Sequence, residues 1–302
     1  MRRALTWLGF VFGGLVALVM VAAGAVYGLS SLRMTKTYAT QPATVAVPTD
    51  AEAIARGQHL AVAVGKCTDC HGQVLAGGIV IDDPAIGRIV ASNLTKGKGG
   101  IGGQRSDADF VRAIRHGLKP DGTSVIFMPA QEFYHFSDAD LGALIVYIKS
   151  VPPVDNELPA ITVGPMMRAL FLAGQVDLLP AELIDHAAPH PAAPEPGVTV
   201  AYGEYLAQTG GCLGCHGPGL SGGPVPGTPP SFPPARNITP AGRLGQWSEA
   251  DFIRAMRTGI IPGGESIDEF MPWKSIGQLT DNELKAMWMY LQSVPPRPYG
   301  NR

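Results

Sequence analysis

The sequence has little charge and few cysteines. Of its 302 residues only 16% are charged, and 23 basic residues almost balance 25 acidic ones. This near-equal number of positive and negative charges gives no electrostatic indication of nucleic-acid binding. A chain that is 46% hydrophobic is also not a disordered polyelectrolyte. Four cysteines are too few for a disulfide scaffold in a chain of this length. Glycine and proline are abundant, with 38 and 27 copies, which predicts long loops.

Charge is missing altogether from one N-terminal segment. No charged residue occurs from Ala4 to Leu32, a run longer than the roughly 20 apolar residues that cross a bilayer. Ala23-Gly24-Ala25 offers a small-residue cleavage pattern, so a cleaved signal sequence is the alternative. We expect residues 1–33 to be a single transmembrane anchor, followed by a polar tether over residues 34–50.

The rest of the chain is a tandem repeat. Five sequence blocks recur in the same order, among them GQHLAVAVGKCTDCHG against GEYLAQTGGCLGCHG and SDADFVRAIRHG against SEADFIRAMRTG. Such self-similarity indicates two homologous structural units. We therefore predict two domains, residues 51–153 and 198–302, and a connector over residues 154–197.

Each repeat has the pattern of three helices separated by long loops. Ser106 and Ser248 are each followed by an acid three residues later, which predicts capping boxes at two helix starts. Gly57 and Gly203 occupy the first predicted helix of each repeat, where they would permit close approach of another helix. No segment of either repeat alternates convincingly as a strand. The predicted fold class is all-α and loop-rich.

All four cysteines lie in two copies of a C-x-x-C-H motif. The copies are Cys67-Thr68-Asp69-Cys70-His71 and Cys212-Leu213-Gly214-Cys215-His216. This motif is the attachment signature of a c-type haem, in which two thiols reach the two vinyl groups and the histidine supplies an axial nitrogen. Structural zinc favours paired motifs about 15–20 residues apart, and a redox dithiol favours a βαβ context. Those alternatives, and simple disulfides, fit the spacing poorly.

Each iron also needs a second axial ligand or an open position. Met128 and Met271 are equivalent in the repeat, and each lies in a Phe-Met-Pro sequence before the last predicted helix. The other histidines have no such match; His59, for example, is replaced by Tyr205. The sequence therefore predicts two covalent haems. Their axial pairs are His71 with Met128 and His216 with Met271.

On these motifs, the two halves resemble class I cytochrome c domains. The whole is similar to membrane-anchored dihaem cytochromes c, in particular to the cytochrome c subunits of bacterial membrane-bound alcohol and gluconate dehydrogenases. Those subunits typically carry three haems, whereas this chain has two attachment motifs. The resemblance implies that the Asn-Leu-Thr and Asn-Ile-Thr segments, with Arg105 and Trp247, lie near the haem propionates. Haem attachment occurs outside the cytoplasm, so we expect the domains on the periplasmic or outer face of the cell membrane.

His/Met ligation fills both axial positions and suits single-electron transfer. We expect an electron carrier, alone or as the cytochrome subunit of an oxidoreductase complex. Its donor would be a membrane dehydrogenase or quinol-oxidising complex, and its acceptor a terminal oxidase or soluble cytochrome. A dihaem peroxidase or thiosulfate-oxidising enzyme is the alternative, and a structural or haem-sensing module is a third.

Overall fold

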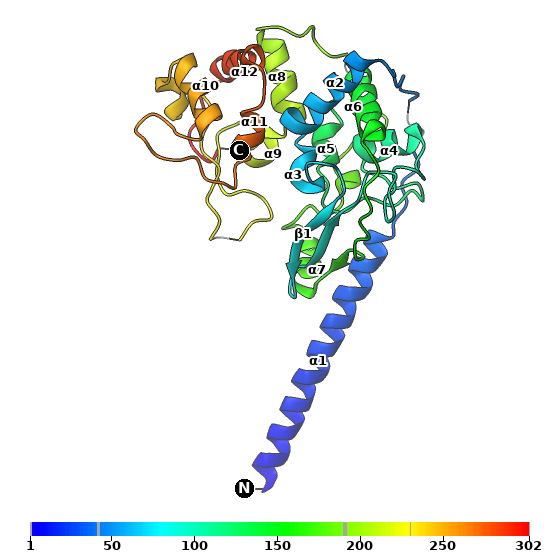
Figure 1. Cartoon of the computed structure of the whole chain (residues 1–302). Coiled ribbons are helices and arrows are strands. Elements are labelled where there is room, and N and C mark those ends of the chain that lie inside the picture. Colours follow the sequence, from blue (N-terminus) through cyan, green and yellow to red (C-terminus); the bar gives the residue numbers. More distant parts are fainter. Residues whose placement is uncertain (1, 41–42, 190–191, 230, 302) are drawn as a thin grey trace.

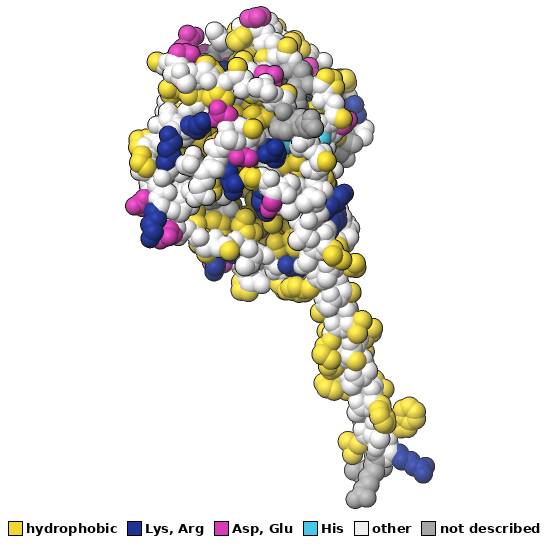
Figure 2. Space-filling view, turned by 90° about the vertical axis from the view of Figure 1, so that its right-hand side faces the viewer, with side chains coloured by type: hydrophobic (Ala, Val, Ile, Leu, Met, Phe, Trp, Pro, Cys, Tyr) yellow, Lys and Arg dark blue, Asp and Glu magenta, His cyan; other side chains and the backbone are white. Residues whose placement is uncertain are grey.

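A long N-terminal helix carries a head of short helices and loops (Figure 1). The computed structural model describes residues 2–40, 43–189, 192–229 and 231–301. The long helix, α1, runs from Arg2 to Met34. Within Leu5–Met34, the most apolar 18-residue window has a mean hydropathy of 2.3, and none of that window is buried. Hydrophobic side chains follow the helix in Figure 2, as in a membrane span or a signal sequence.

The C-terminal end of α1 is docked against the connector. Arg33 forms an ion pair with Glu182, with 2.6 Å between Nη2 and Oε2. Arg168, on helix α7 (Pro165–Leu172), donates to the Ser30 hydroxyl at 2.7 Å. Ser30 is fully buried by this contact. The helix therefore meets the head through fixed polar contacts.

The segment expected to be a tether lies along the first repeat. The Tyr38 N–H donates to the Gly122 carbonyl at 2.9 Å, and Val45 is buried in the core. The Ala46 carbonyl oxygen lies only 2.1 Å from where a Cβ on Gly142 would be. The segment links α1 to the first repeat, and it contacts that repeat at these points, while most of its described residues are exposed.

The two repeats share one helical plan. The first contains α2 (Ala51–His59), the π-helical turn η1 (Leu60–Val64), α3 (Cys67–His71), β1 (Gly78–Asp83), β2 (Gly87–Ala91), α4 (Asp107–His116), α5 (Ala130–Phe133) and α6 (Asp138–Ser150). The second contains α8 (Val200–Thr209), α9 (Cys212–His216), the 3₁₀ turn η3 (Arg243–Gln246), α10 (Glu249–Thr258), α11 (Trp273–Ile276) and α12 (Asp281–Ser293). Between them lie β3 (Thr162–Val163), α7 and the 3₁₀ turn η2 (Pro180–Glu182).

The first and last helices of each repeat cross at a glycine. A Cβ on Gly57 would lie 1.9 Å from the Ala143 carbonyl oxygen of α6. A Cβ on Gly203 would lie 2.0 Å from the Ala286 carbonyl oxygen of α12. No side chain fits at either position, which confirms the predicted close approach.

The predicted helix starts are confirmed as well. Ser106 and Ser248 each form a complete capping box with the acid three residues later. The same two helices end at Gly117 and Gly259, whose φ angles of 64° and 70° lie in the left-handed region that favours glycine. Local sequence therefore sets both ends of α4 and α10.

The mostly helical class holds, but the prediction that neither repeat contains a strand is wrong for the first. A three-stranded antiparallel sheet has the order β1-β2-β3, and its third strand comes from the connector. Asp83 Oδ1 accepts from the N–H of Ala85 and of Ile86, which closes the β1–β2 hairpin. Both strands are short and show no clear alternation of apolar and polar residues, so they lack the usual strand signal.

The two repeats share a single hydrophobic core. One continuous cluster of buried side chains includes Leu60 and Leu144 from the first repeat and Leu206 and Leu284 from the second. In Figure 1 the first and last helices of the two repeats lie next to each other at the top of the head. The repeats are therefore packed into one body.

A buried polar network crosses this junction. Arg56 pairs with Asp140 at 2.9 Å, and His59 Nε2 lies 2.7 Å from Glu283 Oε2. The Tyr205 hydroxyl donates to Asp140 at 2.7 Å, which mirrors the His59–Glu283 contact. Burial disfavours the charged form of Glu283, but the His59 hydrogen bond and charge and the Arg56 charge outweigh it. Together they lower the pKa of Glu283 to about 2.

Candidate haem-binding cavity

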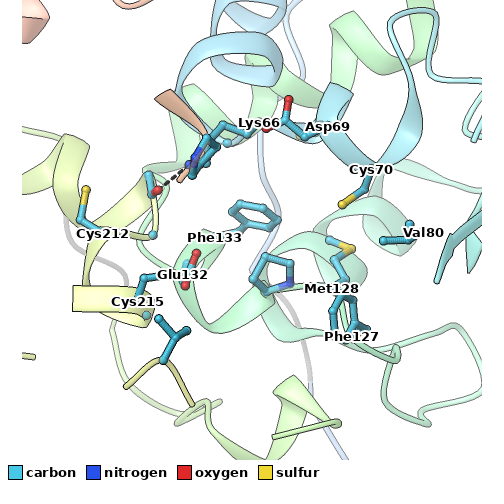
Figure 3. A pocket seen from close by; sticks show the side chains of 18 of the residues that line it. Lys66, Asp69, Cys70, Val80, Phe127, Met128, Glu132, Phe133, Cys212 and Cys215 are labelled. Atoms are coloured by element: carbon cyan, nitrogen blue, oxygen red, sulfur yellow. Dashed lines mark hydrogen bonds between the residues drawn. The ribbon is translucent and has the colours of Figure 1, made fainter. Parts of the chain in front are cut away.

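A cavity of about 1920 Å³ lies between the two repeats. All ten residues predicted as attachment, ligand or propionate contacts lie on its wall: Cys67, Cys70, His71, Arg105, Met128, Cys212, Cys215, His216, Trp247 and Met271. Figure 3 shows part of this wall, with Cys70 and Met128 on one side and Cys212 and Cys215 on the other. The structure thus brings both motifs and both methionines to one space.

The two attachment helices begin in the same way. Lys66 precedes α3 with a φ of 51°, and Gly211 precedes α9 with a φ of 71°. A left-handed residue at this point turns the chain sharply from the preceding helix into the motif. Each motif then forms a single helical turn, which brings its two cysteines and histidine to the cavity wall.

Both motif histidines are oriented by a backbone carbonyl. His71 Nδ1 lies 2.7 Å from the Ser92 carbonyl oxygen, and His216 Nδ1 lies 2.7 Å from that of Arg236. A carbonyl only accepts, so Nδ1 carries the hydrogen and Nε2 keeps the lone pair that a metal needs. Burial lowers the pKa of His71, which favours the neutral form that can bind a metal.

The asparagines that follow these carbonyls brace the loops. Asn93 donates to the Val154 carbonyl at 2.8 Å and accepts from the N–H and hydroxyl of Thr95. Asn237 repeats the pattern, donating at 2.8 Å to the Arg297 carbonyl. Asn93 is 1% exposed. The side chains of Asn93 and Asn237 therefore stabilise the loop that orients each motif histidine.

The two methionines lie in matching loops. Phe127, just before Met128, has a φ of 68° and donates its N–H to the Leu178 carbonyl at 3.1 Å. The carbonyl of Met128 accepts from Ala130, and that of Met271 accepts from Trp273. Each methionine therefore ends a constrained turn immediately before α5 or α11. Its thioether is a soft, weak ligand that suits haem iron.

The thiols are compatible with covalent attachment. No disulfide joins the four cysteines, all of which lie in the described part of the chain. Burial raises the pKa of Cys67 to about 12 and that of Cys212 to about 11. The S–H group that adds across a vinyl double bond is thus intact at neutral pH. The donor set and the cavity fit a c-type haem in each repeat.

Arg105 and Trp247 each lie on the cavity wall directly before a capping box. Both are half-buried, and the propionate contacts expected of them remain a prediction.

Other parts of the wall have no sequence signal. Val80 and Ile89 come from the hairpin, Met167 comes from the connector, and Phe232 comes from a loop of the second repeat. Apolar residues in loops carry no motif, so only the fold assigns them to the cavity.

Paired attachment motifs, oriented imidazoles and matched thioethers around one cavity define a c-type haem protein. Comparison with known families agrees with this class. Residues 200–295 match the family described as cytochrome c, and residues 52–148 match cytochrome c oxidase, cbb3-type, subunit III. The chain is therefore a dihaem cytochrome c, with one covalently bound c-type haem in each of its two cytochrome c domains.

Several curated proteins are similar to the chain. The cytochrome c subunit of alcohol dehydrogenase (quinone) from Gluconacetobacter polyoxogenes is 31% identical over 285 residues, covering 82% of this chain and 57% of that protein. The fructose dehydrogenase cytochrome subunit of Gluconobacter japonicus is 30% identical over 289 residues, with coverages of 83% and 55%. The gluconate 2-dehydrogenase cytochrome c subunit of Pantoea cypripedii is 34% identical over 110 residues, covering 34% of the chain and 25% of that protein. The chain thus spans little more than half the length of the first two relatives.

Proposed function

We propose that the chain is a membrane-anchored relay that passes single electrons through its two haems. The observation that carries this proposal is the presence of two complete sets of attachment cysteines, histidine and methionine on the wall of one cavity. Bound there, each haem supplies a one-electron couple at its iron. No substrate would bind iron whose two axial positions are filled.

The residues of the chain have separate tasks in this relay. The four motif cysteines hold the haems covalently, and the carbonyls of Ser92 and Arg236 fix the imidazoles of His71 and His216. The thioethers of the two matched methionines complete the ligand sets. A haem held at this many points keeps its geometry in both redox states, which suits rapid electron transfer.

The relatives suggest the donor. They are named as cytochrome subunits of alcohol, fructose and gluconate dehydrogenases. We infer that this chain accepts electrons from a membrane-bound dehydrogenase or a quinol-oxidising complex. It would pass them to an oxidase or a soluble cytochrome on the periplasmic side.

The docked end of α1 supports an anchor that stays attached. Cleavage after Ala25 would leave a nine-residue remnant, Val26–Met34, of which Ser30 and Arg33 are engaged by the connector. N-terminal sequencing of the mature membrane protein should find the native start. A start at Val26 would instead show a cleaved signal and a soluble cytochrome.

Rapid mixing tests the relay directly. The reduced wild-type protein, mixed with an oxidised soluble cytochrome c, should lose one electron from each haem. It should neither bind carbon monoxide readily nor turn over peroxide. Ready carbon monoxide binding at one haem, together with peroxide turnover, would replace the relay with the enzymatic alternative.

A further inference from the structure

Each attachment helix touches the other domain through the helix that follows the methionine loop. In one direction, α5 begins directly after Met128-Pro129 and carries Glu132. In the other direction, α11 begins directly after Met271-Pro272 and carries Ser275. Glu132 and Ser275 occupy equivalent positions of the repeat.

Glu132 of the first domain lies against α9 of the second. A Cβ on Gly211 would be 1.9 Å from Glu132 Oε2, and a Cβ on Gly214 would be 2.3 Å from Oε1. The carboxyl group thus fills the space left open by Gly214 of the second attachment motif and by Gly211 directly before it. Figure 3 shows it between Cys212 and Cys215 on one side and Phe133 and Met128 on the other.

The reciprocal contact involves Asp69 of the first attachment helix. The Ser275 hydroxyl donates to Asp69 Oδ1 at 2.7 Å. Asp69 and Gly214 are equivalent positions within the two C-x-x-C-H motifs. Equivalent positions of the two repeats therefore form both contacts. Asp69 of the first motif contacts Ser275, and Gly214 of the second motif contacts Glu132.

One basic residue lies at the same junction. Lys66, next to Cys67, donates to the carbonyls of Val64 in its own domain and Gly210 in the other. Burial raises the pKa of Glu132 and the Lys66 charge opposes that rise. A carboxyl group and an ammonium group thus lie between the two haem attachment motifs, where burial weakens solvent screening.

We propose that these reciprocal contacts couple the two haems. Glu132, which belongs to the first domain, is a positioning residue for the haem of the second domain. The contacts join the ligand loop of each haem to the attachment helix of the other. They hold the two motifs in one arrangement, so that electrons pass directly between the haems without domain movement. This inference rests on the proposed relay.

The first test is Glu132→Gln in the full-length protein with both haems bound. Replacing the half-buried carboxyl group beside α9 with an amide should raise the reduction potential of the second haem more than that of the first, because reduction adds negative charge there. Redox titration measures both, and the component displaced by Met271→Ala identifies the second haem. Glu157→Gln is the matched control, since Glu157 is an exposed acid of the connector paired with Lys98, and it should shift neither component.

A second variant leaves Glu132 in the sequence but displaces its carboxyl group. Gly214→Ala places a methyl group where Glu132 Oε1 lies, and the end of this flexible side chain can swing away without unfolding the helix. It should also shift the second haem and slow electron equilibration between the haems. In the Glu132→Ala background the same glycine substitution should have little effect, because the conflicting atoms are gone.

Several outcomes would overturn the coupling. They are an unchanged second-haem potential in Glu132→Gln, a shift confined to the first haem, or an effect of Gly214→Ala that persists without Glu132. A purely structural contact would change thermal stability and leave both potentials in place. The two reduction potentials are measured without a physiological partner, so a negative result for the coupling leaves the proposed relay intact. A wild-type protein that passes no electrons to an acceptor would instead contradict the relay itself.

Discussion

The two domains orient their motif histidines identically but enclose them differently. In both, Nδ1 of the histidine lies 2.7 Å from a loop carbonyl. Around the first motif the cavity wall includes a β-hairpin and the connector. Around the second it includes a proline-rich loop and the Phe232–Phe270 pair, whose ring centroids are 5.0 Å apart and whose residues are 42% and 43% exposed. The orientation of the motif histidines is thus constant, while the surroundings of the two motifs differ.

The largest effect should come from removing one pair of attachment cysteines. Cys67→Ala with Cys70→Ala should lower the haem content from two to one per chain, and Cys212→Ala with Cys215→Ala should do the same for the other domain. A pyridine haemochrome assay after acid–acetone extraction measures the covalent haem. Wild-type haem that extracts freely would contradict both attachment sites.

Removing one methionine should open one haem only. Met128→Ala or Met271→Ala should abolish the iron–sulfur charge-transfer band of that haem, lower its potential and admit carbon monoxide. Carbon monoxide titration of each reduced variant measures this opening, with Met256→Leu as the core control. A variant that keeps the band and still excludes carbon monoxide would show that its methionine is not a ligand.

A smaller effect is expected at the domain junction. Glu283 has its pKa lowered to about 2 from 4.5, so its ion pairs stabilise the folded state fully above about pH 4.5 and lose that effect as pH falls towards 2. Glu283→Gln should therefore lower the free energy of unfolding at neutral pH by on the order of 3 kcal/mol. The difference from wild type should vanish in acid.

Denaturant unfolding at several pH values measures this effect. Glu204→Gln, at an exposed position of α8, should change little at any pH. A destabilisation by Glu283→Gln that stays constant down to pH 2 would show that the charge of Glu283 is not its cause.

Local patterns predicted much of this fold. Ser106 and Ser248 begin their helices, and Gly57 and Gly203 mark the helix crossings, because each depends on contacts within a few residues or on a missing Cβ. The C-x-x-C-H motifs likewise encode their chemistry in consecutive residues. Such features need no knowledge of the tertiary structure.

Contacts between the repeats could not be predicted in this way. The placement of Glu132 against Gly211 and of Ser275 against Asp69 depends on how two domains pack. The hairpin could not be predicted because its strands are short and their sequences do not alternate between apolar and polar residues. The segment before α2 contains two prolines and five threonines, which is typical of a tether, yet Val45 is buried in the core.

The central claim is that histidine and methionine occupy the two axial positions of both haem irons. Near-infrared magnetic circular dichroism of the oxidised full-length protein tests it most directly, because the position of the low-spin charge-transfer band identifies the axial pair. We predict two low-spin haems, both with the His/Met signature. A high-spin signal, or a His/His signature at either haem, would contradict the account.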